Sequence, residues 1–134
     1  MAVDSGFDPV RFWRHFGVHG HNGFLGLEYV THTADHIEVK IPHRQGFAEG
    51  AVVALLDSAA TLAIWTKAGR FRPHATVDLR IDHLAAPPPN TEIIARAECY
   101  CLEDKVAYVR ATARTGEGLT VAVSTAVHLF TDVT

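Results

Sequence analysis

The sequence predicts an α+β fold in which one curved antiparallel β-sheet wraps around a single long helix. Its 134 residues are the usual size of one domain, and 48% of them are apolar, so we expect a single domain over residues 1–134. Residues 46–65 form a helix-length run that is apolar on every side except at Asp57. Segments of alternating apolar and polar residues precede and follow this run. Since a helix that is apolar all round must be surrounded by protein, the strands are expected to enclose it.

The segment before the long helix predicts a short helix and a hairpin. Asp8 is a favourable N-cap and Pro9 fits the first helical position, so a helix should begin there and end at Gly17. Two β-like runs, 26–32 and 36–42, follow a turn-rich stretch. They are expected to pair as a hairpin.

The long helix should run from about Gly50 to about Ala68, because Gly69 is a typical residue after a helix end. In the strand that follows, Val77, Leu79 and Ile81 should share one face. The Pro-rich segment 87–90 breaks the chain after that strand. The four strands expected after the helix cover residues 74–84, 91–103, 105–115 and 119–130.

Composition excludes several classes of function. The net charge is only −3 and basic residues do not cluster, so a nucleic-acid partner is not expected. The N-terminal residues lack a signal-peptide pattern, and Lys67 and Arg70 close the longest apolar run, so we expect a cytoplasmic protein without a membrane partner. Cys99 and Cys101 are expected to be reduced thiols.

Asp57 is the main candidate for chemistry. It lies too far into the helix to serve as an N-cap, and an ionised carboxylate in apolar surroundings is costly unless it is used or paired. A catalytic base or nucleophile is one explanation; a structural Asp that hydrogen-bonds Ser58 or Thr61 is the other. The histidines at 15, 19 and 21 lack an accompanying ligand at metal-site spacing, so no metal site is expected.

Two stretches resemble a known family. QGFAEGAVVALLDSAATLA, followed by HATVDLRIDHLAAP, is similar to the PaaI-like branch of the 4-hydroxybenzoyl-CoA thioesterase superfamily. That family shows an Asp seven residues after a helix-start Gly, as Asp57 follows Gly50 here, and then a strand that opens with Thr-Val-Asp-Leu, as at Thr76. The resemblance covers roughly residues 25–130 and implies the hotdog fold, which is a curved antiparallel sheet around a central helix.

The resemblance also implies a function: acyl-CoA thioester hydrolysis without a cofactor. Asp57 would attack the thioester carbon or activate a water, and backbone N–H groups of Glu49 and Gly50 would form the oxyanion hole. Thr76 matches a Ser or Thr near the attacking group. The residue that orients substrate in the family corresponds to either His43 or Gln45. Separately, Arg70, Arg72 and Arg80 are suited to contact the phosphates of coenzyme A, and Arg80 is the one assigned to substrate binding.

The sequence departs from the family where Ala48-Glu49-Gly50 stands in place of His-Gly-Gly. A binding protein for acyl thioesters that has lost hydrolysis is therefore the alternative; a hydratase is disfavoured, because no Asp/His pair has the spacing of such enzymes. In the family each site lies across a subunit interface, which implies a homodimer or homotetramer. Apolar residues such as Val121, Val123 and Val127 on the outer face of the sheet would also favour self-association.

Overall fold

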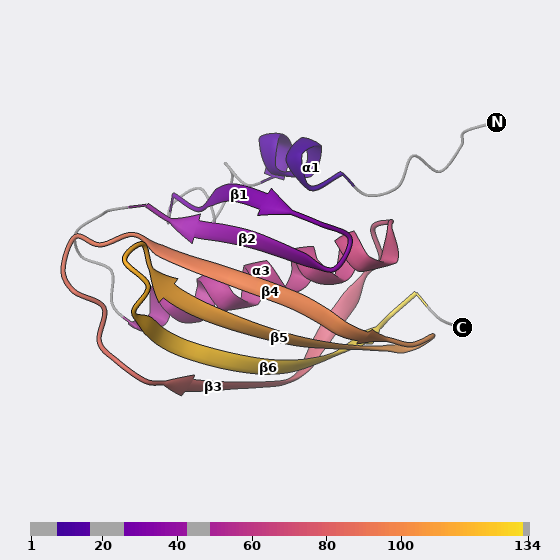
Figure 1. Ribbon diagram of the computed structural model, residues 1–134. Coiled ribbons are helices and arrows are strands. Elements are labelled where there is room, and N and C mark those ends of the chain that lie inside the picture. Colours follow the sequence, from indigo (N-terminus) through magenta and orange to yellow (C-terminus); the bar gives the residue numbers. More distant parts are fainter. Residues whose placement is uncertain (1–7, 17–25, 43–48, 133–134) are drawn as a thin grey trace.

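The computed structural model describes residues 8–16, 26–42 and 49–132. These residues contain two helices and six strands (Figure 1), and the predicted order of elements is confirmed. The helices are α1 (Pro9–Phe16) and α3 (Glu49–Ala68). The strands are β1 (Glu28–His32), β2 (His36–Ile41), β3 (His74–His83), β4 (Ile93–Leu102), β5 (Val106–Thr115) and β6 (Thr120–Phe130).

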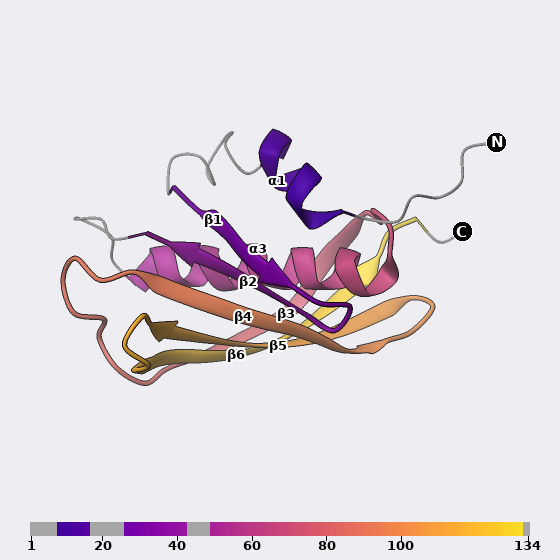
Figure 2. The same ribbon diagram turned by 45° about the horizontal axis from the view of Figure 1, so that its top comes forward.

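The six strands form one sheet in the order β1-β2-β4-β5-β6-β3, and every neighbouring pair is antiparallel. The strand that follows α3 directly, β3, lies at one edge beside β6, and β1 forms the other edge. The turned view shows the sheet curving along α3, while α1 lies beyond β1 (Figure 2). This is the predicted arrangement of a sheet around a helix.

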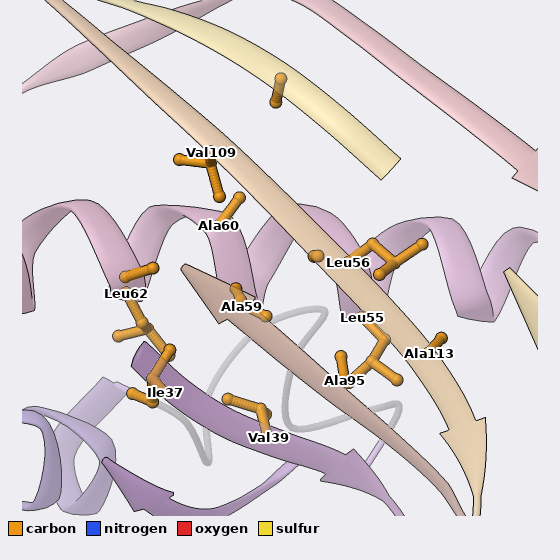
Figure 3. Packing of buried hydrophobic residues seen from close by; sticks show 14 of the residues in the cluster. Ile37, Val39, Leu55, Leu56, Ala59, Ala60, Leu62, Ala95, Val109 and Ala113 are labelled. Atoms are coloured by element: carbon orange, nitrogen blue, oxygen red, sulfur yellow. The ribbon is translucent and has the colours of Figure 1, made fainter. Parts of the chain in front are cut away.

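The core lies between α3 and the concave face of the sheet, as Figure 3 shows for side chains of α3, β2, β4 and β5. Leu55, Leu56 and Ile64 of α3 have no exposed surface. Small side chains on β4 and β5 face the helix, and their lack of bulk lets helix and sheet approach closely. These residues are Ala95, Ala97, Ala107, Ala111 and Ala113.

The stretch 51–68 of α3 is long and apolar enough to cross a membrane by length and composition, with a mean hydropathy of 1.4. The expectation that no run reaches this length is therefore wrong. However, 56% of that window is buried inside the protein, because the sheet covers one side of the helix. A core helix passes the same test, so the stretch is weak evidence for a membrane span.

The outer face of the sheet carries Val121, Val123 and Val127, as expected, together with polar side chains. Val121 is buried, and Val123 and Val127 are half-buried. Charged and hydroxyl side chains from four strands lie around Val123. The alternation along β4 and β5 explains the polar share of this face, since the small apolar residues of both strands turn to the helix.

Candidate functional site

Asp57 lies on a stripe of α3 that the sheet does not cover. The stripe contains Val53, Ala54, Ser58 and Thr61, which are half-buried, while Asp57 itself is exposed in the single chain. The spacing of three and four residues puts all of them on one side of the helix. The expectation of a wholly buried segment around Asp57 is therefore wrong, because an open sheet encloses only part of the circumference of the helix.

The pKa of the Asp57 carboxyl group is nevertheless shifted from its usual value. The surrounding protein removes part of its hydration, which raises its pKa above the usual 3.8, while the nearby imidazole of His74 acts in the opposite direction. In turn, burial lowers the pKa of His74 and the carboxylate opposes that shift. A carboxylate with a raised pKa is a better base than one in water, which suits proton abstraction.

His74 belongs to a buried pair that the sequence analysis missed. His74 and His128 come from the neighbouring strands β3 and β6, and their Nδ1 atoms lie 3.2 Å apart. One Nδ1–H donates to the other Nδ1, so the accepting imidazole is neutral and carries its proton on Nε2. The hydroxyl of Thr76, at 3.5 Å from His128 Nδ1, lies at the limit of hydrogen-bond distance. Thr76 is thus held beside the pair.

The outer nitrogen atoms of this pair remain unsatisfied. Both Nε2 atoms are buried and find no hydrogen-bond partner among the residues that the structure describes. Burial and the neighbouring His74 lower the pKa of His128 to about 4. A buried polar group without a partner costs about 1–3 kcal/mol. The pair is therefore a costly feature, typical of a region that serves more than packing.

Aromatic rings surround the pair at the C-terminal end of α3. The ring of Trp65 lies 5.7 Å from His74 and 4.7 Å from Phe71, measured between centroids. Phe130 contacts His74 edge-on at 6.3 Å. Since Phe71 is 60% exposed, this aromatic cluster extends from the core to the surface. Apolar walls of this kind are typical of small-molecule binding sites.

The candidate oxyanion-hole residues Glu49 and Gly50 lie at the start of α3. α3 begins at Glu49, so Glu49 and Gly50 are in its first turn. The first four N–H groups of a helix have no partner within it, and the helix dipole favours negative charge there. Asp57 follows about two turns later on the same helix. One rigid element thus carries both the carboxylate and the candidate oxyanion donors.

The remaining predicted residues lie on other segments of the chain. His43 and Gln45 lie outside the described residues. Arg80 is exposed on the outer face of β3, where its Nε lies 3.5 Å from Oδ2 of Asp82. Within the described ranges no hydrogen bond joins Asp57 to Thr76.

Other arginines proposed for phosphate contacts have different positions. Arg72 is 7% exposed and forms a double contact with Asp132, through Nε–Oδ2 at 2.9 Å and Nη2–Oδ1 at 2.8 Å. It also lies 3.6 Å over the centroid of Phe130. Arg72 is thus structural, whereas Arg70 is exposed. No group of three or more potential metal ligands occurs in the part of the chain that the structure describes; His19 and His21 lie outside it.

The histidine pair was detectable in part from the sequence. His128 stands between Ala126 and Phe130 in an alternating strand, so its parity places it on the buried face. The pairing with His74 was not detectable, because it depends on β3 crossing to the far edge of the sheet and on the register His74↔Phe130, Thr76↔His128.

Comparisons with known proteins agree with this geometry. The chain is similar in structure to a thioesterase from Haemophilus influenzae, with a TM-score of 0.82 and 20% identity over 94% of this chain and 92% of that chain. A thioesterase family protein from Silicibacter pomeroyi gives 0.76 and 21%, over 90% and 93%. A hypothetical thioesterase from Streptococcus pneumoniae, solved with coenzyme A, gives 0.70 and 16%, over 78% and 85%.

These similarities show the hotdog fold, and no curated protein sequence matches the chain. The sequence profile of the Thioesterase superfamily matches residues 49–122, from the start of α3 into β6. The match covers more than half of the chain and includes Gly50, Asp57 and Thr76. The chain belongs to the Thioesterase superfamily.

Proposed function

We propose that the protein is an acyl-CoA thioesterase of the PaaI-like branch, with Asp57 as its catalytic carboxylate. The position of Asp57 is the observation that carries the proposal. Asp57 lies on the uncovered stripe of α3 and its pKa is raised, and the first turn of the same helix supplies free N–H groups. The superfamily match and the coenzyme A bound to the pneumococcal neighbour support a CoA thioester as substrate.

Two routes of hydrolysis fit this arrangement. As a base, Asp57 takes a proton from water, the hydroxide adds to the thioester carbonyl carbon, and the C–S bond breaks as the thiolate leaves and takes up a proton. As a nucleophile, its carboxylate adds to the same carbon, the C–S bond breaks and the thiolate leaves and takes up a proton; the mixed anhydride that remains is hydrolysed by water to the free acid and the Asp57 carboxylate. In both routes N–H groups of Glu49 and Gly50 stabilise the oxyanion.

The complete site requires two copies of the chain in this proposal. Asp57 on the open stripe of one copy would meet Thr76 on β3 of the other, because both residues are exposed in the single chain and β3 is an edge strand. A homodimer, or a dimer of dimers, is therefore the functional unit. The substrate-binding roles of His43, Gln45 and Arg80 stay predictions.

The variant Asp57→Asn tests the proposal. The amide keeps the shape of the side chain, so the fold should persist while turnover of acyl-CoA falls about a hundredfold or more, the usual scale for loss of a general base. Asp78→Asn, a change of the same kind at an exposed position of β3, serves as control and should keep full turnover. Turnover that survives in Asp57→Asn, with a lowered melting temperature, would make Asp57 a packing residue.

The replacement of His-Gly-Gly by Ala48-Glu49-Gly50 favours one second candidate, an acyl-thioester-binding protein without hydrolysis. The side chain of Glu49 brings negative charge to the helix start, which opposes a developing oxyanion if it points toward it. Thiol release and thermal shift, measured with the same panel of acyl-CoAs, separate the candidates. Stabilisation without thiol release by the unmodified protein would favour the binding protein.

A further inference from the structure

The buried pair of His74 and His128 takes no part in the proposed hydrolysis, yet it lies against a residue that does. Thr76 stands directly opposite His128 in the pairing of β3 with β6, so both side chains project from the same face of the sheet. Oγ1 of Thr76 lies 3.5 Å from Nδ1 of His128, and this nitrogen lies 3.2 Å from Nδ1 of His74. The hydroxyl is thus one end of a chain of three polar groups.

A β-bulge at Val77 determines the face on which Thr76 lies. The register shifts between Thr76 and Asp78, so Val77 is the extra residue of β3. Thr76 therefore shares the face of His128, whereas Arg80 lines the outer face. Bulges often stand beside active sites, where they change the direction of a side chain. The backbone of β3 is thus irregular at the position where the hydroxyl meets the imidazole.

Packing from three elements holds the ring of His128 in place. None of its surface is exposed. The ring of His74 meets it edge-on, with the centroids 4.8 Å apart and the planes at 87°. His74 in turn lies against Trp65 of α3 and Phe130 of β6. A ring that is fixed by its neighbours can hold the hydroxyl of an edge strand in one position.

The protons of the pair leave the hydroxyl proton of Thr76 free to donate. Burial lowers the pKa of both rings, so both are neutral at neutral pH. If Nδ1 of His128 carries its proton, this nitrogen is a donor and Oγ1 of Thr76 accepts from it. If Nδ1 of His74 carries the proton, the one lone pair on Nδ1 of His128 already accepts from His74. In neither case does His128 offer a free lone pair to the hydroxyl.

We propose that His128 is a positioning residue of the candidate site, which holds the hydroxyl of Thr76 so that it donates to the bound thioester or to the attacking water. The proposal rests on the proposed function, in which Thr76 belongs to the site. His74 acts with His128, because it occupies the same Nδ1. The contact of 3.5 Å is long, as hydrogen bonds of catalytic sites often are before substrate binds. This role explains why the chain keeps a pair whose buried Nε2 atoms find no partner among the described residues.

A double-mutant cycle between Thr76→Val and His128→Phe tests the proposal. Valine keeps the shape of threonine without the hydroxyl, so kcat should fall about a hundredfold, the scale for loss of one donor. Phenylalanine fills the place of the imidazole without its Nδ1, so a misplaced hydroxyl should lower kcat about tenfold, with little change in KM. In the double variant, His128→Phe should cause no further loss, because the hydroxyl through which it acts is gone. Thr112→Val, the same change on the outer face of β5, is the control and should keep full turnover.

His128→Asn separates positioning from packing. Its amide places a polar atom where Nδ1 of the imidazole lies, but it leaves part of the space of the ring empty. Positioning predicts that His128→Asn keeps more of kcat than His128→Phe, whereas packing predicts the reverse order. The reverse order overturns the proposal. An unchanged kcat in His128→Phe or in Thr76→Val also overturns it, as does an equal loss from His128→Phe with and without the Thr76 hydroxyl.

Two further measurements cover the other outcomes. If the unmodified protein releases no thiol, the proposed function fails, and the cycle is measured instead in the Kd for the acyl-CoA that stabilises the protein most; additive losses overturn the positioning role there too. If the His128 variants do not fold, nitrogen-15 NMR of the imidazoles compares Thr76→Val with the unmodified protein. A shifted Nδ1 resonance of His128 supports the proposal, and an unchanged one overturns it. Loss of turnover in Asp57→Asn together with an additive cycle overturns this proposal alone and leaves the proposed function standing.

Discussion

At the scale of a single residue, His128 makes the stability of the protein depend on pH. None of its surface is exposed, and its pKa in the folded protein is about 4, against 6.5 for an ordinary histidine. Between these two pH values the unfolded chain binds a proton that the folded chain excludes. Stability is therefore complete above pH 6.5 and is lost as the pH falls toward 4, by about 3 kcal/mol at most. His74, whose pKa is also lowered, acts in the same sense.

Urea unfolding at several pH values between 7 and 4 measures this effect. The variant His128→Asn, which cannot titrate in this range, should show a shallower decline in the free energy of unfolding. Asp57 acts in the opposite sense at the acid end, because its raised pKa favours proton binding by the folded state. Equal slopes for the variant and the unmodified protein would show that His128 does not control the decline.

Asp57 predicts the acid limb of the rate profile. If its ionised form is the base or nucleophile, kcat/KM for an acyl-CoA should fall as the pH is lowered through its pKa. That pKa lies above the usual 3.8, since lost hydration outweighs the influence of His74. Circular dichroism at the same pH values separates loss of rate from unfolding. A rate that stays flat down to pH 3.8 in folded protein would contradict an ionised Asp57 in the reaction.

At the scale of elements, Arg72 links three segments of the chain. Its side chain binds Asp132 beyond β6 and donates to the carbonyl of Asp104 in the β4–β5 turn, while its own carbonyl accepts from Nε1 of Trp65 in α3. Its guanidinium also covers the ring of Phe130. These contacts hold the end of α3 against the sheet, close to the histidine pair.

Arg72→Ala should lower the free energy of unfolding by about 3 kcal/mol, because it removes a buried charged partner and the packing on Phe130. Arg72→Lys is the matched control: it keeps the charge but loses the planar double contact, so its loss should be smaller. Thermal and urea unfolding measure both. A neutral Arg72→Ala would show that the ion pair with Asp132 contributes nothing net.

The elements themselves were largely predictable from the sequence, because their local signals agree. The strand limits differ from the prediction by a residue or two, and α3 ends at Ala68 before Gly69, whose φ is +73°. The register shift between Thr76 and Asp78 was not predictable, because alternation in TVDLRI is unbroken in sequence. That shift places Thr76 beside His128 and leaves Val77 63% exposed, so it shapes the candidate site.

At the scale of the whole molecule, the site was less predictable than the fold, because its candidate residues come from different elements. Gly50 and Asp57 share one helix, so their spacing alone relates them. Thr76 and Arg80 are close in sequence but lie on opposite faces of the sheet, after the register shift in β3. Alternation assigns charged side chains to the outer face, yet which of them are neighbours depends on the pairing of four strands. The spacing of residues within one helix or strand can be read from the sequence, whereas contacts between strands depend on the order and register of the sheet.

The open edge of β3 bears on the assembly of the whole molecule. β3 spans His74–His83 and has a neighbour on one side only, β6. The N–H of Leu84 bonds to the carbonyl of Val121 on β6. By antiparallel alternation, the backbone groups of Ile81 point the other way, to the open edge. A long edge strand with free N–H and C=O groups is a template for pairing with another chain, and we expect it to pair with β3 of a second copy.

Ile81→Pro tests this expectation. Proline removes the N–H at the open edge without removing a donor to β6, so the sheet within the chain should persist while edge pairing weakens. The mass from light scattering should fall to about half, and thiol release should fall with it, because Asp57 and Thr76 would no longer meet. Ile81→Ala loses side-chain packing but keeps the N–H, so it should retain the mass and serves as the matched control. If Ile81→Pro keeps both the mass and the turnover, β3 is not the edge through which the copies share their sites.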